Sequence, residues 1–279
     1  MGISLWDRIA VLHDMYLICS ATLIPILRSI FVEPSLLLHP KRLKNVIFSN
    51  VWTYMSPGVD EGGREVKESL IRPNAFGYVL DLGAGESMRG DTYTRRVYLW
   101  AHVLTYPPGQ GHTLKYLDRK KVTRYIALEP NGLFHDKIRE AARNAGFGPS
   151  DVDILGYGAE QTDEITRLLG SHRVDTILSV LTLCGVPGEK AMIERLCTDV
   201  LNPRGGQLLF YEHVLCDDKN LAFWQRIWSP LWQPLVGCRL DRPTHKWIDE
   251  LDVWTTRELS GKPNEPINLF WHKVGRYVR

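Results

Sequence analysis

The sequence predicts an α/β fold: a mostly parallel sheet covered by helices and preceded by a helical extension. Three observations support this prediction. From residue 77 onward short apolar stretches alternate with helical stretches, the first apolar stretch ends in a glycine turn, and the second ends in a carboxylate followed by proline. Such alternation is typical of parallel strands joined by crossover helices. Their carboxyl ends meet at one edge of the sheet, which is where ligands bind in folds of this kind.

Residues 1–70 predict helices and loops without a strand pattern. Chain breaks are expected at Pro34, Pro40 and Pro57-Gly58. An uncharged, mostly apolar run covers 15–27, and a run of that length is short of the roughly 20 residues that span a bilayer. Acidic residues at Asp7 and Asp14 also argue against a signal peptide. Two interpretations of residues 5–32 therefore stay open: a helix lying in a membrane interface, or a helical cap over the active site.

Residues 71–279 predict a single sheet-containing domain. The expected strands cover 77–82, 125–128, 152–155, 174–180 and 207–213. The expected helices between them cover 133–145, 163–169 and 189–201. A last apolar run, 267–278, is expected to supply a final, antiparallel strand.

The turn after the first expected strand contains Asp81, Gly83 and Gly85. The two glycines allow a tight turn and a close approach to a ligand, because they have no Cβ. Asp81 can accept hydrogen bonds from the ammonium of an amino-acid ligand, directly or through water, although Asp is also common as a helix cap. A dinucleotide turn needs a third glycine where this chain has Met88. The pattern therefore favours S-adenosylmethionine over a dinucleotide.

The second strand end supplies Glu129, followed by Pro130. A carboxylate there can accept hydrogen bonds from the two vicinal hydroxyls of a ribose. The ribose-binding acid usually follows the glycine turn by about 20 residues, whereas Glu129 lies 48 residues after Asp81. The excess length is assigned to an insertion over 90–116, interpreted as a surface excursion, with a lid over the substrate as the alternative.

The later strand ends supply further candidates. Ala159 and Glu160 follow the third strand and are placed beside the adenine, and Val180 ends the fourth strand beside the methionine part of the cofactor. Glu212 and His213 close the fifth strand and are the candidates for a general base. A hydrogen-bonded structural histidine is an equally good interpretation of His213.

A tryptophan-rich segment follows the fifth strand. Trp224, Trp228 and Trp232 recur at a spacing of four, which places their rings near one helical face until Pro230 and Pro234 disturb the register. We interpret this segment as a wall of a pocket for an apolar acceptor. A stripe of aromatic core residues is the competing interpretation.

Charge and cysteine content exclude several classes of protein. The chain has 34 basic and 32 acidic side chains and no long basic stripe, so no nucleic-acid partner is expected. Its five cysteines form no CxxC pair and no zinc spacing, so no metal is expected. An odd, scattered set of thiols indicates an intracellular, cytosol-facing protein.

The motifs together resemble a known family. The matching stretches are Asp81-Leu-Gly-Ala-Gly, Leu128-Glu-Pro-Asn131, Glu212-His213, Phe223-Trp-Gln225 and Gly237-Cys-Arg-Leu240. Over residues 78–279 this series is similar to the membrane-associated methyltransferase-like thiol S-methyltransferases. The resemblance implies S-adenosylmethionine as cofactor, a Rossmann-like class I methyltransferase sheet and an N-terminal membrane anchor. This chain departs from the family in its long insertion and in its less apolar anchor.

These observations predict an S-adenosylmethionine-dependent methyltransferase acting on an apolar small molecule with a thiol or hydroxyl acceptor. The alternative is a non-catalytic, membrane-associated protein that retains a cofactor-binding fold. The sequence leaves the oligomeric state open.

Overall fold

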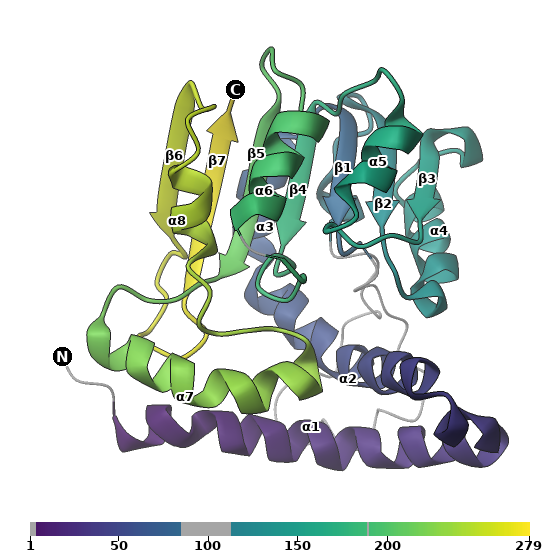
Figure 1. Ribbon diagram of the computed structural model, residues 1–279, viewed down its shortest axis with the longest axis vertical. Helices are drawn as coiled ribbons and strands as arrows, with labels where there is room; N and C mark the ends of the chain where they lie inside the picture. The colour runs from purple at the N-terminus through teal and green to yellow at the C-terminus, as the bar shows by residue number, and fades with distance from the viewer. Residues whose placement is uncertain (1–3, 85–112, 189) are drawn as a thin grey trace.

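A computed structural model describes residues 4–84, 113–188 and 190–279 of the chain (Figure 1). Its sheet has seven strands in the order β3-β2-β1-β4-β5-β7-β6. The strands are β1 (Gly77–Leu82), β2 (Val122–Leu128), β3 (Val152–Leu155), β4 (Thr176–Val180), β5 (Gln207–His213), β6 (Thr256–Gly261) and β7 (His272–Val278). Strands β1 to β5 are parallel to one another, and β7 pairs antiparallel with both β5 and β6. The predicted α/β sheet with an N-terminal helical extension is confirmed.

The sequence missed one strand, β6. All six residues of β6 are exposed, and a strand without a buried face lacks the apolar alternation by which strands are recognised. It lies at the edge of the sheet, paired only with β7 among the described strands. The final antiparallel strand is confirmed but starts at His272, later than the predicted run.

Helices cover both faces of the sheet. One face carries α5 (Thr162–Leu169), α6 (Lys190–Arg195) and α8 (Thr244–Asp249), and the other carries α3 (Arg64–Asn74) and α4 (His135–Asn144) (Figure 1). Each face has its own cluster of buried apolar side chains, because successive residues of a strand point to opposite sides. The doubly covered sheet explains why β4 is buried along its whole length.

The N-terminal region consists of helices, as predicted. Helix α1 covers Leu5–Val32, a 3₁₀ turn covers Pro34–Leu38, and α2 covers Pro40–Gly62. Pro34 and Pro40 each begin a helical segment, where the missing N–H costs nothing. The break expected at Pro57-Gly58 is wrong, because α2 continues through it while Ser56 and Asp60 are held in the interior. The division at residue 70 stays a prediction; that residue lies inside α3.

Helices α1, α2 and α7 (Lys219–Val236) form a layer beyond the carboxyl ends of the parallel strands (Figure 1). Two side chains link the layer internally. The indole N–H of Trp52 in α2 donates to the carbonyl of Val236 at 3.0 Å, and that of Trp228 in α7 donates to the carbonyl of Arg8 in α1 at 2.5 Å. Helix α7 runs without a break through Pro230 and Pro234. The site at the carboxyl edge is therefore bounded by this helical layer.

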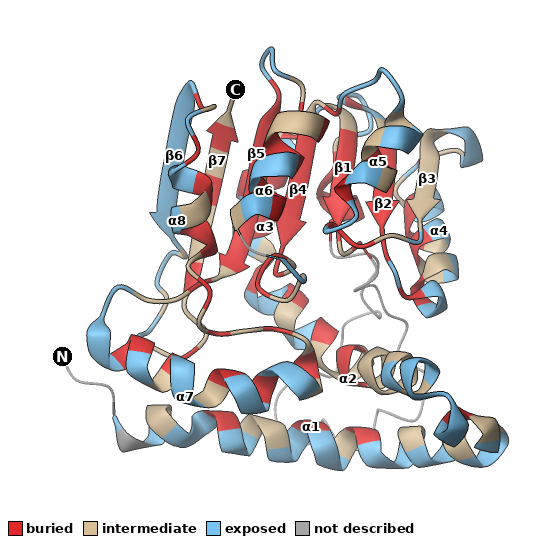
Figure 2. Ribbon diagram, viewed as in Figure 1, coloured by how far each residue is buried: buried red, intermediate tan, exposed pale blue. Residues whose placement is uncertain are grey.

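Helix α1 has an inner side that packs against α2 and α7 and an outer side that is open to solvent (Figure 2). Val11, Ile18 and Thr22 are buried on the inner side. The apolar stretch Trp6–Val32 contains 27 residues, enough to cross a membrane by length and composition. This stretch is longer than the uncharged run 15–27 expected from the sequence. The helix continues through Asp14 and Arg28, the charged residues at the two ends of that run. Helix α1 nevertheless runs beside α7 and α2 over most of its length (Figure 1).

Candidate functional site

The ends of the first three parallel strands lie in lateral register. Leu82 of β1 pairs with Leu128 of β2, and Leu128 pairs with Leu155 of β3. The next residues, Gly83, Glu129 and Gly156, therefore leave the sheet side by side. Pairing of Leu82 with Ser179 places Val180 next to them from β4. The sequence prediction that these strand ends share one edge is confirmed.

Gly83 forms the turn at the end of β1. Its φ of +67° lies in the left-handed region, and a Cβ there would come within 2.7 Å of the Thr182 side chain. The N–H groups of Gly83 and Ala84 both donate to the carbonyl of Leu128, at 3.0 and 3.2 Å. The Thr182 hydroxyl donates to the carbonyl of Leu82 at 2.9 Å. Only glycine fits at position 83. The turn places its backbone at the carboxyl edge of the sheet.

Asp81 is buried one residue before the end of β1. Its carboxylate accepts hydrogen bonds from the hydroxyl of Tyr125, at 2.5 Å, and from the hydroxyl of Thr113. Burial raises the pKa of the Asp81 carboxyl to about 6, although both hydroxyl donors lower it. Thr113 and the short helical turn Leu114–Tyr116 belong to the predicted insertion. These residues are not the expected surface excursion, because Thr113, Leu114 and Tyr116 are buried.

Glu129 stands directly after β2 and is buried at 5 % exposure. One carboxylate oxygen accepts the N–H of Asn131 at 2.7 Å, and the backbone N–H of Glu129 donates to Leu155 at 2.9 Å. These bonds fix the carboxylate at the edge, and a carboxylate is the kind of group that accepts hydrogen bonds from ribose hydroxyls. Pro130 follows it and is exposed. The side chain of Asn131 donates to the carbonyl of Asn45 in α2 at 3.4 Å, which joins this strand end to the helical layer.

The remaining cofactor candidates also follow strand ends. Ala159, after β3, is 3 % exposed, whereas the neighbouring Glu160 is exposed. Val180 is the last residue of β4 and is buried at 5 % exposure. Gly85 and most of the insertion lie outside the described residues. Assignment of these side chains to adenine, ribose or methionine contacts stays a prediction.

Glu212 is a buried carboxylate that holds the loop after β4. It accepts hydrogen bonds from the Ser179 hydroxyl at 2.6 Å and from the backbone N–H groups of Thr182, Leu183 and Cys184 at 2.9, 3.1 and 3.3 Å. Burial raises the pKa of Glu212, against the lowering effect of these donors. Its acceptor sites are thus engaged by the chain itself. This arrangement suits a residue that positions the loop better than it suits a general base.

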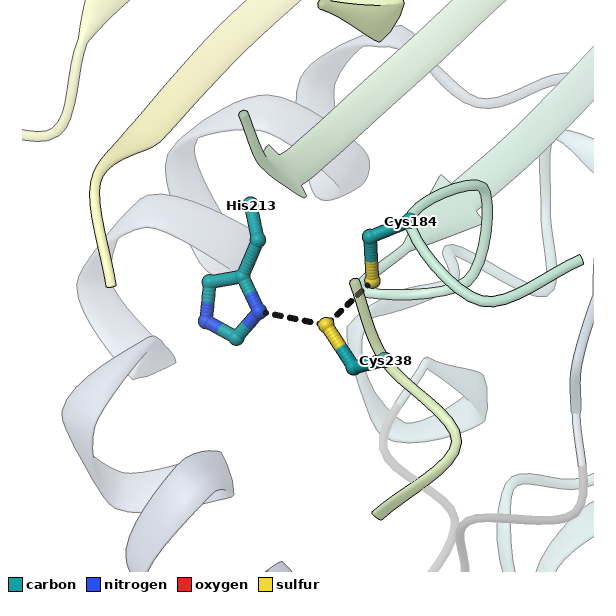
Figure 3. Close-up of side chains that lie close together, drawn as sticks. All are labelled: Cys184, His213 and Cys238. Carbon is teal, nitrogen blue, oxygen red and sulfur yellow. Dashed lines mark hydrogen bonds between the residues drawn. The ribbon is translucent and has the colours of Figure 1, made fainter. Parts of the chain in front are cut away.

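His213, the last residue of β5, contacts two cysteines that are distant in sequence. Its Nδ1 lies 3.1 Å from the Sγ of Cys238, which lies 2.9 Å from the Sγ of Cys184 (Figure 3). Burial raises the pKa of the Cys238 thiol, but the hydrogen bond with Cys184 and the neighbouring imidazole outweigh it, so the net pKa is lowered. The sequence prediction included neither cysteine in the site. Three sequence signals bear on the cluster: Cys184 follows one strand of the predicted sheet, His213 ends the next, and Cys238 lies in the Gly237-Cys-Arg-Leu240 stretch of the family resemblance.

The three tryptophans of α7 have different surroundings. Trp232 is 2 % exposed, and its ring centroid lies 5.0 Å from that of Phe270. Trp228 donates to α1, and the guanidinium of Arg8 lies 5.7 Å from the ring centroid of Trp224. All three therefore have packing partners within the protein. Their role as an acceptor wall stays a prediction.

Comparison with solved structures identifies the fold. No family model matches the chain, and no curated protein matches it. An O-methyltransferase family protein from Burkholderia thailandensis aligns with a TM-score of 0.51 at 14 % identity, over 97 % of this chain and 71 % of its own. A putative O-methyltransferase from Nostoc punctiforme aligns with a TM-score of 0.49 at 11 % identity, over 82 % of this chain and 60 % of its own.

The chain has a methyltransferase fold. The likeness to the Burkholderia protein extends over 97 % of this chain, whose sheet has antiparallel β7 between β5 and β6. This confirms the Rossmann-like class I sheet expected from the sequence. The resemblance to thiol S-methyltransferases stays a prediction.

Proposed function

We propose that the protein is an S-adenosylmethionine-dependent methyltransferase that acts on an apolar small molecule at a membrane surface. The observation that carries the proposal is the juxtaposition of the Gly83 turn and the Glu129 carboxylate at the carboxyl edge of a methyltransferase-type sheet. The left-handed φ of Gly83 turns the backbone sharply beside Glu129, and a carboxylate at that place can accept hydrogen bonds from ribose hydroxyls. These features fit the nucleoside half of the cofactor.

The protein's own residues supply binding and alignment. Bound S-adenosylmethionine would contribute a methyl group on a sulfonium. Glu129 would hold the ribose, while Glu212 keeps the loop after β4 in place through its backbone donors. Alignment of two reactants in this way can be worth about 7–11 kcal/mol of barrier. A thiol acceptor, with a pKa near 8.5, needs little help from a base, whereas a hydroxyl acceptor would need His213.

The outer side of α1 supports the membrane part of the proposal. Its exposed apolar side chains include Trp6, Ile24 and Phe31, and Phe31 is 86 % exposed. Exposed basic residues Lys41, Arg42 and Lys44 follow at the start of α2. An apolar face bordered by positive charge fits an anionic lipid surface. Because Val11 and Ile18 are buried against the layer, α1 is proposed to lie on the membrane rather than cross it.

Methyl transfer tests the enzymatic proposal. Full-length protein is incubated with methyl-labelled S-adenosylmethionine and a panel of apolar thiols and phenols. Label transfer to at least one class is expected. Cofactor binding without transfer to any acceptor would instead favour the non-catalytic alternative, for which the engagement of Asp81 by Thr113 and Tyr125 is the supporting observation.

Vesicle flotation tests the membrane proposal. Wild-type protein should float with anionic vesicles, and the double variant Ile24→Glu, Phe31→Glu should not. Leu168→Glu is the matched control. Leu168 is 50 % exposed and lies in α5, which covers a face of the sheet and is separate from α1. If the double variant still floats with the vesicles, the outer side of α1 is not the membrane-binding surface. If the wild type is a dimer that dissociates on mutation, this side binds a second copy of the chain instead.

A further inference from the structure

Three atoms that can bind a metal converge at the carboxyl edge from three separate parts of the chain. Cys184 lies in the loop after β4, His213 ends β5, and Cys238 follows α7 (Figure 3). The two sulfurs and an imidazole nitrogen all lie within 4.8 Å of one another. Both cysteines are buried, at 0 % and 3 % exposure. The proposed methyl-transfer function uses His213 only for a hydroxyl acceptor and does not use the cysteines at all.

The backbone brings the two cysteines together by a close approach of neighbouring glycines. A Cβ on Gly185 would lie 2.5 Å from the carbonyl oxygen of Gly237. Gly237 itself ends α7 with a φ of +82°, which favours glycine. The N–H of Arg239 donates to the carbonyl of Cys184 at 3.1 Å and holds the two segments in register. The two thiols are thus fixed by the backbone rather than by chance contact of flexible side chains.

The donor set and its spacing suit zinc. Zn²⁺ binds thiolate sulfur at about 2.3 Å and imidazole nitrogen at about 2.0–2.1 Å in tetrahedral geometry, so bound sulfurs lie about 3.8 Å apart. The two sulfurs here are 2.9 Å apart, and the Cys238 sulfur is 3.1 Å from the imidazole nitrogen. Each of these two pairs would need to open by less than about 1 Å, and the third pair, Cys184 and His213, lies within 4.8 Å. Rotation of side chains supplies a movement of this size without moving the backbone.

We propose that Cys184, His213 and Cys238 bind one Zn²⁺ ion and that its fourth coordination position takes the sulfur of the thiol acceptor. Zinc sites with three protein ligands leave one position for water or substrate, whereas structural zinc sites use four protein ligands. The described residues contribute three ligand atoms to this cluster. The acceptor part rests on the proposed methyltransferase function, but the metal site does not.

Coordination would prepare the acceptor for methyl transfer. Zinc-bound thiols lose their proton outright, and that proton passes to bulk water. The thiolate sulfur would then form the new bond to the methyl carbon while the sulfonium carbon–sulfur bond breaks. The bonding pair stays on the departing thioether, so no oxidant or reductant is needed. Coordination at this place beside β4 and β5 would therefore generate the nucleophile without a protein base.

Cobalt substitution tests the metal site directly. Full-length protein, purified reduced and without oxygen, is titrated with Co²⁺ and then with Zn²⁺. One equivalent of Co²⁺ should give the thiolate charge-transfer and visible bands of a tetrahedral site, and Zn²⁺ should displace it. Cys184→Ser, Cys238→Ser and His213→Asn should each weaken binding by about 100-fold or more, since even outer-shell changes cost 10–100-fold.

Cys197→Ser is the matched control. Cys197 is also buried, at 1 % exposure, but it lies in the opposite core cluster. This variant should bind the metal as wild type does. Melting temperature and S-adenosylhomocysteine affinity of each variant establish that it is folded. Equal loss in Cys197→Ser, or wild-type protein that binds no stoichiometric metal, would overturn the site.

An added thiol tests the open position. Thiophenol added to the cobalt form should shift its charge-transfer band, and an unchanged spectrum would overturn the acceptor assignment while leaving the metal site. A Cys184–Cys238 disulfide that persists in the reduced preparation would overturn both. Cofactor binding without metal would leave the proposed function standing, whereas metal binding without cofactor binding would remove that function and keep the site.

Discussion

Asp81 and Glu212 are both buried carboxylates, yet their donors give them different tasks. Glu212 accepts three backbone N–H groups and one hydroxyl, so its oxygens are occupied in organising the loop that carries Cys184. Among the residues that the structure describes, Asp81 accepts hydrogen bonds from two side-chain hydroxyls, those of Thr113 and Tyr125. A ligand ammonium that binds Asp81 would have to take the place of one of these hydroxyls. The kind of donor thus distinguishes Glu212, which positions a loop, from Asp81, for which cofactor binding stays a prediction.

The pH dependence of stability tests the environment of Asp81. Its pKa is raised to about 6 in the folded protein, against about 3.9 when unfolded. The folded state therefore holds the proton more tightly. The stability contributed by Asp81 is complete below about pH 4 and is lost as the pH rises through about 6, by up to about 3 kcal/mol.

Asp81→Asn should remove this dependence. In urea unfolding at pH values from 4 to 7, the free energy of wild type should fall relative to that of the variant as the pH rises. Parallel curves for the two proteins would mean that Asp81 does not titrate in this window.

Glu129 provides the residue-scale test of the cofactor site. Glu129→Ala should weaken S-adenosylhomocysteine binding by about 10- to 100-fold, because a hydrogen bond to a charged group is worth about 1.5–3 kcal/mol. Glu129→Gln keeps one acceptor oxygen and should lose less. Isothermal titration calorimetry measures both. Wild-type affinity in Glu129→Ala would remove Glu129 from the ribose site.

Helices α2 and α3 are joined by a buried ion pair. Lys67 of α3 and Lys115 both contact the carboxylate of Asp60 in α2, and the Tyr116 hydroxyl donates to the same carboxylate at 3.3 Å. The Lys67 side chain is only 1 % exposed. The contacts of Lys115 and Tyr116 with Asp60 therefore connect the segment that begins at Thr113 to the N-terminal helices.

Asp60→Asn should destabilise this junction strongly. It replaces the anion facing two ammonium groups by a neutral amide, which typically costs about 3–5 kcal/mol for a buried pair. Glu68→Gln is the matched control, because Glu68 pairs with Arg72 on the exposed side of α3 and such pairs are worth about 0–0.5 kcal/mol. Urea unfolding compares the two. Equal small losses would show that the Asp60 cluster is not buried as described.

Substitutions of the tryptophans in α7 distinguish a packing role from a role in acceptor binding. Trp232→Ala should cost about 3–5 kcal/mol, because its ring is buried against Phe270. Trp228→Phe loses one hydrogen bond to α1, worth about 0.5–1.5 kcal/mol, and should speed proteolysis of α1. Thermal melts and limited proteolysis check these effects. A raised acceptor KM with normal melting in Trp228→Phe would favour the acceptor wall over packing.

At the scale of the molecule, the sequence predicted what local patterns determine. The starts and ends of β1, β3 and β5 agree with their apolar runs, and Gly83 and Glu129 lie where the strand ends indicated. The exposed strand β6 has no such pattern. The continuity of α2 through Pro57 depends on packing on both sides of the proline rather than on local preference.

The features that sequence missed depend on contacts between distant segments. Cys184, His213 and Cys238 meet only because α7 returns to the carboxyl edge and Gly237 meets Gly185 there. The burial of Thr113 and Tyr116 likewise requires Asp81 and Asp60, which precede the insertion. The position of α1 likewise depends on distant contacts: it lies in the layer beyond the strand ends and exposes an apolar outer side, and its association with a membrane stays a prediction.

Calorimetric titration of the full-length protein with S-adenosylhomocysteine tests the central claim, a nucleoside-cofactor site at the carboxyl edge. We predict saturable one-to-one binding in the range of about 1 μM to 1 mM that is typical of enzyme substrates. Gly83→Val should abolish it, because its side chain would strike Thr182 at a left-handed φ, and folding of that variant is checked by its melt. Absence of saturable binding to folded wild-type protein would contradict the account.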